Sequence, residues 1–126
     1  ERGGSRGNLY VHVAIKRHAI FERVGSDLLI EAKIGIHQAA LGSEIEAPTL
    51  DGKVVLKIPS GTQPGKVFRI KGKGLPDLRG HGTGDELVRI NVDIPERLNS
   101  NEKKLLEEFA KSRDGKAIFS RWHIER

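Results

Sequence analysis

The sequence predicts a mainly β fold: a small two-layer β-sandwich of short strands with one short internal helix, followed by a carboxy-terminal α-helix. Three observations support this prediction. Apolar and polar residues alternate over several short runs, as in strands with one buried face. Glycine and proline separate these runs, and an Asp-Gly pair joins two of them. Only the stretch after Pro95 has sustained helical spacing.

The first elements of the predicted sandwich follow in order. Residues 27–34 alternate, with apolar side chains at the even positions, which predicts a strand. Residues 36–41 predict a short helix that Gly42 ends, because glycine accepts the left-handed conformation found after helices.

Four more strands are expected after this helix. Two of them, 44–49 and 53–58, are joined by a turn that contains Asp51 and Gly52, and Asp-Gly is a strong hairpin signal. The others are residues 67–71 and 86–94, with a long glycine-rich loop between them.

An internal repeat suggests how the chain is divided. Residues 7–13 match residues 84–90 at an offset of 77, each as a glycine-rich loop that leads into a strand. A repeat makes residues 1–17 the last strand of a preceding, truncated β-domain, and 18–96 a second β-domain. Shared turn-and-strand chemistry could also produce the match by chance.

Residues 97–126 are expected to form a helical dimerisation segment with a tail. Asn99 and Glu102 have the spacing of a capping box for a helix from 100 to about 112. Burial of apolar side chains against a second chain would stabilise a homodimer. The expected dimerisation residues are Leu105, Leu106, Phe109, Ile118, Phe119 and Trp122. The alternative is a tail that frays or folds back on its own domain.

Charge and composition limit the classes of function. The excess of five positive charges could suit nucleic acid, but lysine and arginine alternate with acidic residues along nearly the whole chain. The alternative function is a basic nucleic-acid-binding β-module that uses Arg69, Lys71, Lys73 and Arg79. No apolar run reaches the roughly 20 residues that span a bilayer. We expect no membrane partner and a cytoplasmic location.

No catalytic or metal site is expected. Residues 61–66 superficially resemble a phosphate loop, but three residues rather than four separate the glycines, and Val67 follows the lysine. There is no cysteine, and no two of the five histidines have one-turn helical spacing. No grouping of serine, histidine and an acid lies in an elbow or oxyanion motif. We therefore expect neither an enzyme nor a cofactor in this chain.

The strand at 27–34 is the candidate binding element. We expect it at a sheet edge, where free amides and carbonyls would accept an extended peptide as an added strand. This kind of binding depends on the peptide backbone more than on its sequence. The rival interpretation is that the apolar side chains of this strand simply form core.

Four runs of sequence carry a family resemblance. They are ALGSEIEAPTLDGKV at 40–54, IPSGTQPGK at 58–66, FRIKGKGLP at 68–76 and GDELV at 84–88. With them, the chain from about residue 7 to 110 resembles the second carboxy-terminal β-domain of DnaJ-type co-chaperones.

The resemblance implies two tandem β-domains that hold unfolded or extended polypeptide for a DnaK-type chaperone. The positions that match the family's client groove are Ile30 and Ala32, with Ala47 and Thr49 opposite. Family members pair through their carboxy ends, which assigns homodimerisation to the helix and tail. The family's His-Pro-Asp motif and cysteine-rich zinc repeats are absent from this chain. Zinc is therefore expected only in parts of the parent protein that this chain lacks.

Overall fold

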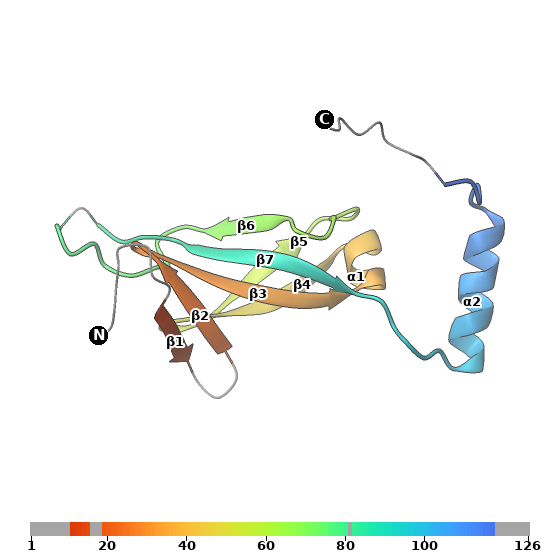
Figure 1. Cartoon of the computed structure of the whole chain (residues 1–126), viewed down its shortest axis with the longest axis horizontal. Coiled ribbons are helices and arrows are strands. Elements are labelled where there is room, and N and C mark those ends of the chain that lie inside the picture. Colours follow the sequence, from red (N-terminus) through yellow and green to blue (C-terminus); the bar gives the residue numbers. More distant parts are fainter. Residues whose placement is uncertain (1–10, 16–18, 81, 118–126) are drawn as a thin grey trace, which may run out of the picture. The chain divides into compact units, whose positions relative to one another are not determined.

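Figure 1 shows a computed structural model of the chain, in which residues 11–15, 19–80 and 82–117 are described. Two compact units follow one another along the chain, Glu1–Ile94 and Pro95–Arg126. The first unit contains both sheets, and the second contains the long helix. Within the described residues, no helix has the length and apolar character that crossing a membrane requires.

The strands of the first unit form two sheets. One sheet has the order β1-β2-β3-β7-β6, with β3 and β7 parallel and the other neighbours antiparallel. The other sheet is the antiparallel pair β4 and β5. The strands are β1 (Val11–Ile15), β2 (Ala19–Val24), β3 (Asp27–Gly35), β4 (Ser43–Thr49), β5 (Gly52–Ile58), β6 (Val67–Ile70) and β7 (Glu86–Asp93). The helices are α1 (Ile36–Leu41) and α2 (Ser100–Lys111), so the predicted fold class is confirmed.

The core lies between the two sheets. Because successive side chains of a strand point to opposite faces, Ile34, Val88 and Ile90 share the inner face of the larger sheet. They form one buried cluster with residues from α1, β4 and β5, namely Ala39, Ala47 and Ile58. Complete burial of a side chain such as Val88 stabilises the fold by about 1.5 to 3 kcal/mol.

The β4–β5 hairpin forms where the Asp-Gly pair predicts it. Thr49 pairs with Gly52, and the Thr49 hydroxyl donates a 2.9 Å hydrogen bond to the Asp51 carboxylate across the turn. Gly52 has a φ of 144°, which a residue with a side chain adopts only with strain. Pro48 fits in β4 because each strand of a two-stranded sheet has one free edge.

One strand of the large sheet was not predicted. β2 pairs with β1 over Val11–Ile15 and with the first three residues of β3. The turn at Gly25, which has a φ of 63°, separates β2 from β3 and is the signal that could have revealed this hairpin. The assignment of residues 1–17 to a preceding domain stays a prediction.

Candidate functional site

The predicted peptide-binding residues come from two strands that face each other across the core. Ile30 and Ala32 of β3 are half-buried and pack against the core cluster. Ala47 and Thr49 of β4 are 3% and 1% exposed, so they lie beneath the surface. Side chains of β3 and β4 therefore meet in the interior between the two sheets. Peptide contact by these residues stays a prediction.

β3 is not an edge strand, so that expectation was wrong. It lies between β2 and β7 in the sheet. However, β2 pairs only with Asp27, Leu28 and Leu29, and then diverges from β3 (Figure 1). Among the described residues, no strand pairs with the outer side of β3 beyond Leu29. We call this stretch, from Ile30 to Gly35, the β3 margin.

The backbone groups of the β3 margin alternate in direction. The amide of Leu28 donates to the carbonyl of Asp85 at 2.9 Å, so Leu28 faces β7. In a parallel pair, backbone groups of alternate residues face the same neighbour. Ile30 and Ala32 therefore bond toward β7, whereas the amides and carbonyls of Glu31 and Lys33 face outward. Both of these side chains are exposed.

A buried carboxylate that no sequence pattern predicted lies at the start of β7. Glu86 is the first residue of β7, is aligned with Leu28 of β3 and Ile70 of β6, and has no exposed surface. Neither carboxylate oxygen has a hydrogen-bond partner among the described residues. Burial raises the pKa of Glu86 to about 7, and the charge of Lys73 opposes the rise.

A polar network fixes the base of the loop between β6 and β7. The Asp85 carboxylate accepts hydrogen bonds from the Gly72 amide at 2.9 Å and from Arg69 at 2.6 Å. These interactions, led by the Gly72 amide, lower the pKa of Asp85. The Asp27 carboxylate accepts the amide of Asp85 at 2.8 Å. The start of β7 is thereby tied to both β3 and the loop.

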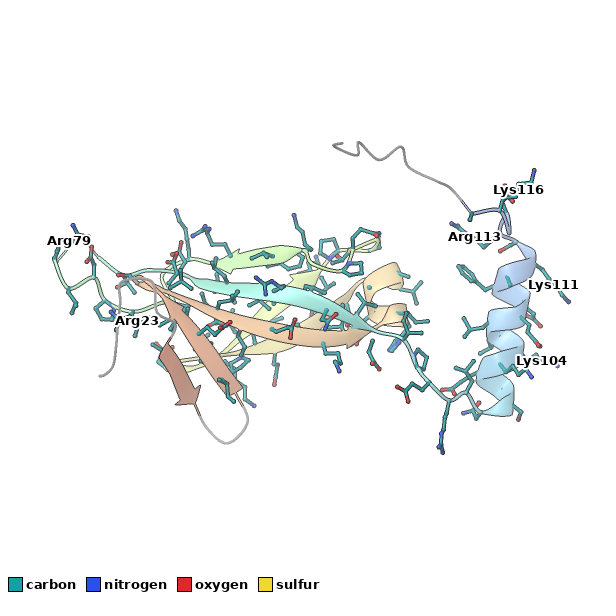
Figure 2. The ribbon with its side chains drawn as sticks, viewed as in Figure 1. Arg23, Arg79, Lys104, Lys111, Arg113 and Lys116 are labelled. Carbon is teal, nitrogen blue, oxygen red and sulfur yellow. The ribbon has the colours of Figure 1, made fainter. Side chains whose placement is uncertain are left out.

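Two of the four cations expected to bind nucleic acid in the alternative function already lie beside carboxylates. Arg69 pairs with Asp85 at 2.6 Å, and Lys73 lies 3.7 Å from Asp51. Arg79 lies in the loop between β6 and β7 (Figure 2). Two of the four expected phosphate contacts would therefore compete with carboxylates that are already in place. The exclusion of nucleic acid stays a prediction.

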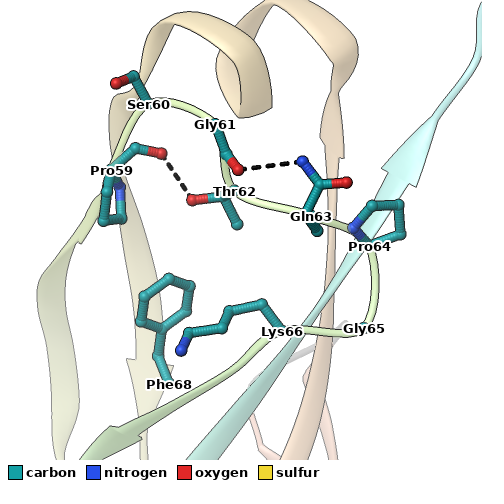
Figure 3. Close-up of a pocket in the computed structure, with 9 residues that line it drawn as sticks. All are labelled: Pro59, Ser60, Gly61, Thr62, Gln63, Pro64, Gly65, Lys66 and Phe68. Atoms are coloured by element: carbon teal, nitrogen blue, oxygen red, sulfur yellow. Dashed lines mark hydrogen bonds between the residues drawn. The ribbon is translucent and has the colours of Figure 1, made fainter.

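A pocket of about 550 Å³ opens beside β6, lined by residues 59–66 and Phe68 (Figure 3). It contains the loop that superficially resembles a phosphate loop. The amides of Gly61 and Thr62 donate to the carbonyl of Ala39 at 2.8 and 3.0 Å, which fixes the loop to α1.

No metal site appears within the described part of the chain, where no group of three or more histidine or acidic side chains is placed to hold an ion. The expected lack of a cofactor stays a prediction.

The carboxy-terminal helix α2 begins as predicted. The Asn99 side chain accepts the Glu102 amide at 2.8 Å, and the Glu102 carboxylate accepts the Asn99 amide at 2.9 Å, a reciprocal capping box. Leu105 and Phe109 are 57% and 59% exposed, and Leu106 is half-buried. Ile118, Phe119 and Trp122 lie outside the described residues. The helix thus presents two large apolar side chains to solvent within the described chain.

Comparison with known proteins agrees with the fold. The DnaJ C terminal domain family matches residues 1–95. "Chaperone protein DnaJ" of Ruminiclostridium cellulolyticum is 52% identical over 109 residues, which cover 86% of this chain and 29% of that protein. The protein of the same name from Clostridioides difficile is 52% identical over 88% of this chain and 29% of its own length. The one from Bacillus cytotoxicus is 50% identical over 89% and 31%.

The chain spans about 30% of the length of these relatives. The resemblance seen in four runs of sequence is confirmed by a family match that covers most of the chain. The chain belongs to the DnaJ C-terminal domain family.

Proposed function

We propose that this chain is the client-holding and pairing part of a DnaJ-type co-chaperone, which holds unfolded polypeptide for a DnaK-type chaperone. The observation that carries the proposal is the β3 margin, whose outer side pairs with no described strand and which lies above half-buried apolar side chains. Such an edge accepts any extended segment, because it bonds to the backbone that all polypeptides share.

A bound segment would extend the sheet next to β3. The outward amides and carbonyls of Glu31 and Lys33 would bond to its backbone, and alternate side chains would pack near Ile30 and Ala32. Each hydrogen bond contributes about 0.5 to 1.5 kcal/mol. So few contacts give weak, reversible binding, which suits a protein that must release its client.

Client holding predicts a specific effect of proline in the β3 margin. Lys33→Pro removes an outward amide and leaves the bonds toward β7 in place, so the fold should survive while strand addition is blocked. In light scattering of a chemically denatured client protein, the wild-type chain should lower aggregation. The protection given by Lys33→Pro should be at least several-fold weaker. Lys116→Ala, which changes an exposed lysine in the other unit, is the matched control.

Equal protection by wild type and Lys33→Pro, with equal urea midpoints, would contradict the assignment of the client to the β3 margin. No protection by the wild-type chain would count against the proposed function itself.

The partner proposed for the apolar face of α2 is a second copy of this chain. Leu105 and Phe109 leave most of their surface in water in one chain. Their burial in a homodimer, together with Leu106 and the tail residues Ile118, Phe119 and Trp122, would remove this apolar surface from water.

Pairing predicts that Leu105→Ala with Phe109→Ala weakens self-association at least ten-fold. Each side chain contributes about 1.5 to 3 kcal/mol if it is fully buried in the dimer. Sedimentation equilibrium measures the change, and Lys104→Ala on the same helix is the control (Figure 2). Phe119→Ala with Trp122→Ala should weaken pairing in the same direction. A wild-type chain that stays monomeric at the highest concentration measured contradicts the proposal.

A further inference from the structure

β6 is a terminal strand of the larger sheet, and its outer side pairs with no described strand. The Ile90 amide donates to the Lys66 carbonyl at 2.7 Å, so this end of the antiparallel pair is a hydrogen-bonded position. Such positions alternate along an antiparallel pair. Phe68 and Ile70 therefore bond toward β7, and the backbone groups of Val67 and Arg69 face outward without a strand partner among the described residues.

The pocket beside β6 is shaped before any ligand binds. The Thr62 hydroxyl donates to the Pro59 carbonyl at 2.6 Å, and the side-chain Nε2 of Gln63 donates to the Gly61 carbonyl at 3.2 Å (Figure 3). The Thr62 hydroxyl and one N–H of the Gln63 side chain are thus engaged within the loop. Phe68 is half-buried and packs against the core cluster, so its ring is a fixed apolar surface of the pocket.

Positive charge lies beside the pocket at this edge. The Lys66 ammonium lies 5.8 Å from the centroid of the Phe68 ring, and no described carboxylate lies within ion-pair distance of it. None of the residues that line the pocket is acidic. Lys71 carries further exposed positive charge just beyond this strand, whereas Arg69 is paired with the Asp85 carboxylate at 2.6 Å. An acidic ligand would therefore meet favourable charge at Lys66, beside the pocket.

We propose that the outer edge of β6 and the adjoining pocket form a second binding site, which takes an acidic, extended polypeptide segment. The segment adds a strand to β6, places an apolar side chain in the pocket against Phe68, and sets a carboxylate beside Lys66. Outward amides and carbonyls match a peptide backbone, which nucleic acid lacks. This site depends on the proposed client-holding function only for the class of ligand, and it uses none of the residues of the β3 margin.

The test is fluorescence anisotropy of the full chain with a short labelled peptide in which leucine and glutamate alternate. Lys66→Glu should weaken binding about ten-fold, because an attractive charge contact becomes a repulsive one. Val67→Pro removes an outward amide and should weaken binding to a similar degree. Lys116→Glu makes the same charge change in the other unit, and Lys33→Pro blocks the β3 margin. Both of these variants should bind the peptide as the wild type does.

Three results overturn the proposal in chains whose urea midpoints match that of the wild type. The first is unchanged binding by both Lys66→Glu and Val67→Pro. The second is loss of binding by Lys33→Pro alone, which assigns the peptide to the β3 margin and leaves the proposed function intact. The third is tighter binding of a single-stranded RNA than of the peptide, with loss of RNA binding in Lys66→Glu, which identifies the cationic edge as a nucleic-acid surface.

Discussion

Glu86→Gln should make the stability of the first unit much less dependent on pH and should raise its free energy of unfolding above neutral pH. The Glu86 carboxyl is buried, no described residue is its hydrogen-bond partner, and burial raises its pKa from 4.5 to about 7. The folded chain therefore retains this proton at pH values where the unfolded chain has lost it. Stability from this group is full below about pH 4.5 and is lost as pH rises toward 7.

The loss amounts to about 3 kcal/mol, since each unit of pKa shift corresponds to about 1.4 kcal/mol. Glutamine has nearly the same shape and no charge to desolvate, so the variant should lack this loss. Urea unfolding across this pH range measures the difference between the two chains. Glu31→Gln, the same change on an exposed side chain of β3, is the control and should track the wild type. A Glu86→Gln chain that loses stability with rising pH as steeply as the wild type would contradict this account.

Gly84→Ala should destabilise the first unit by about 3 kcal/mol, at the upper end of the range for overpacking. A Cβ at residue 84 would overlap the backbone carbonyl of Ser26, and one at Gly74 would lie 2.5 Å from the same oxygen. That carbonyl also accepts the Leu75 amide at 2.8 Å. The two glycines thus let the loop between β6 and β7 lie directly against the turn between β2 and β3.

Urea unfolding measures the effect of Gly84→Ala. Gly115→Ala is the matched control, because nothing lies within 4 Å of a Cβ at that position, and it should change stability by less than about 0.5 kcal/mol. An unchanged midpoint for Gly84→Ala would show that the loop can move away from the turn at little cost.

Local signals predicted most of the strands and both helices. The Asp51-Gly52 turn placed β4 and β5 to within one residue, and the Asn99–Glu102 capping box placed the start of α2. These features depend on residues close in sequence, so they can be recognised without knowing the fold. The strand β2 was missed because Phe21 is the only fully buried apolar side chain among those described in Ile20–Val24.

The candidate site was predicted less completely, because it depends on contacts between distant residues. The apolar side chains of β3 were assigned to one face correctly, but the parallel partner β7 follows β3 only after a long separation in sequence. Whether β3 is an edge strand is decided by β2 and β7, not by its own residues. Burial of Glu86 likewise arises where β3, β6 and β7 meet, and no local pattern predicts it.

Hydrogen exchange of the β3 amides, with and without bound peptide, tests the central claim most directly. A short peptide of alternating leucine and threonine should slow exchange at Glu31 and Lys33, whose amides face outward, because strand addition would give them partners. The amide of Ala32 faces β7 and should exchange slowly in both states. Exchange at Glu31 and Lys33 that stays unchanged when the peptide is fully bound would contradict client holding at the β3 margin.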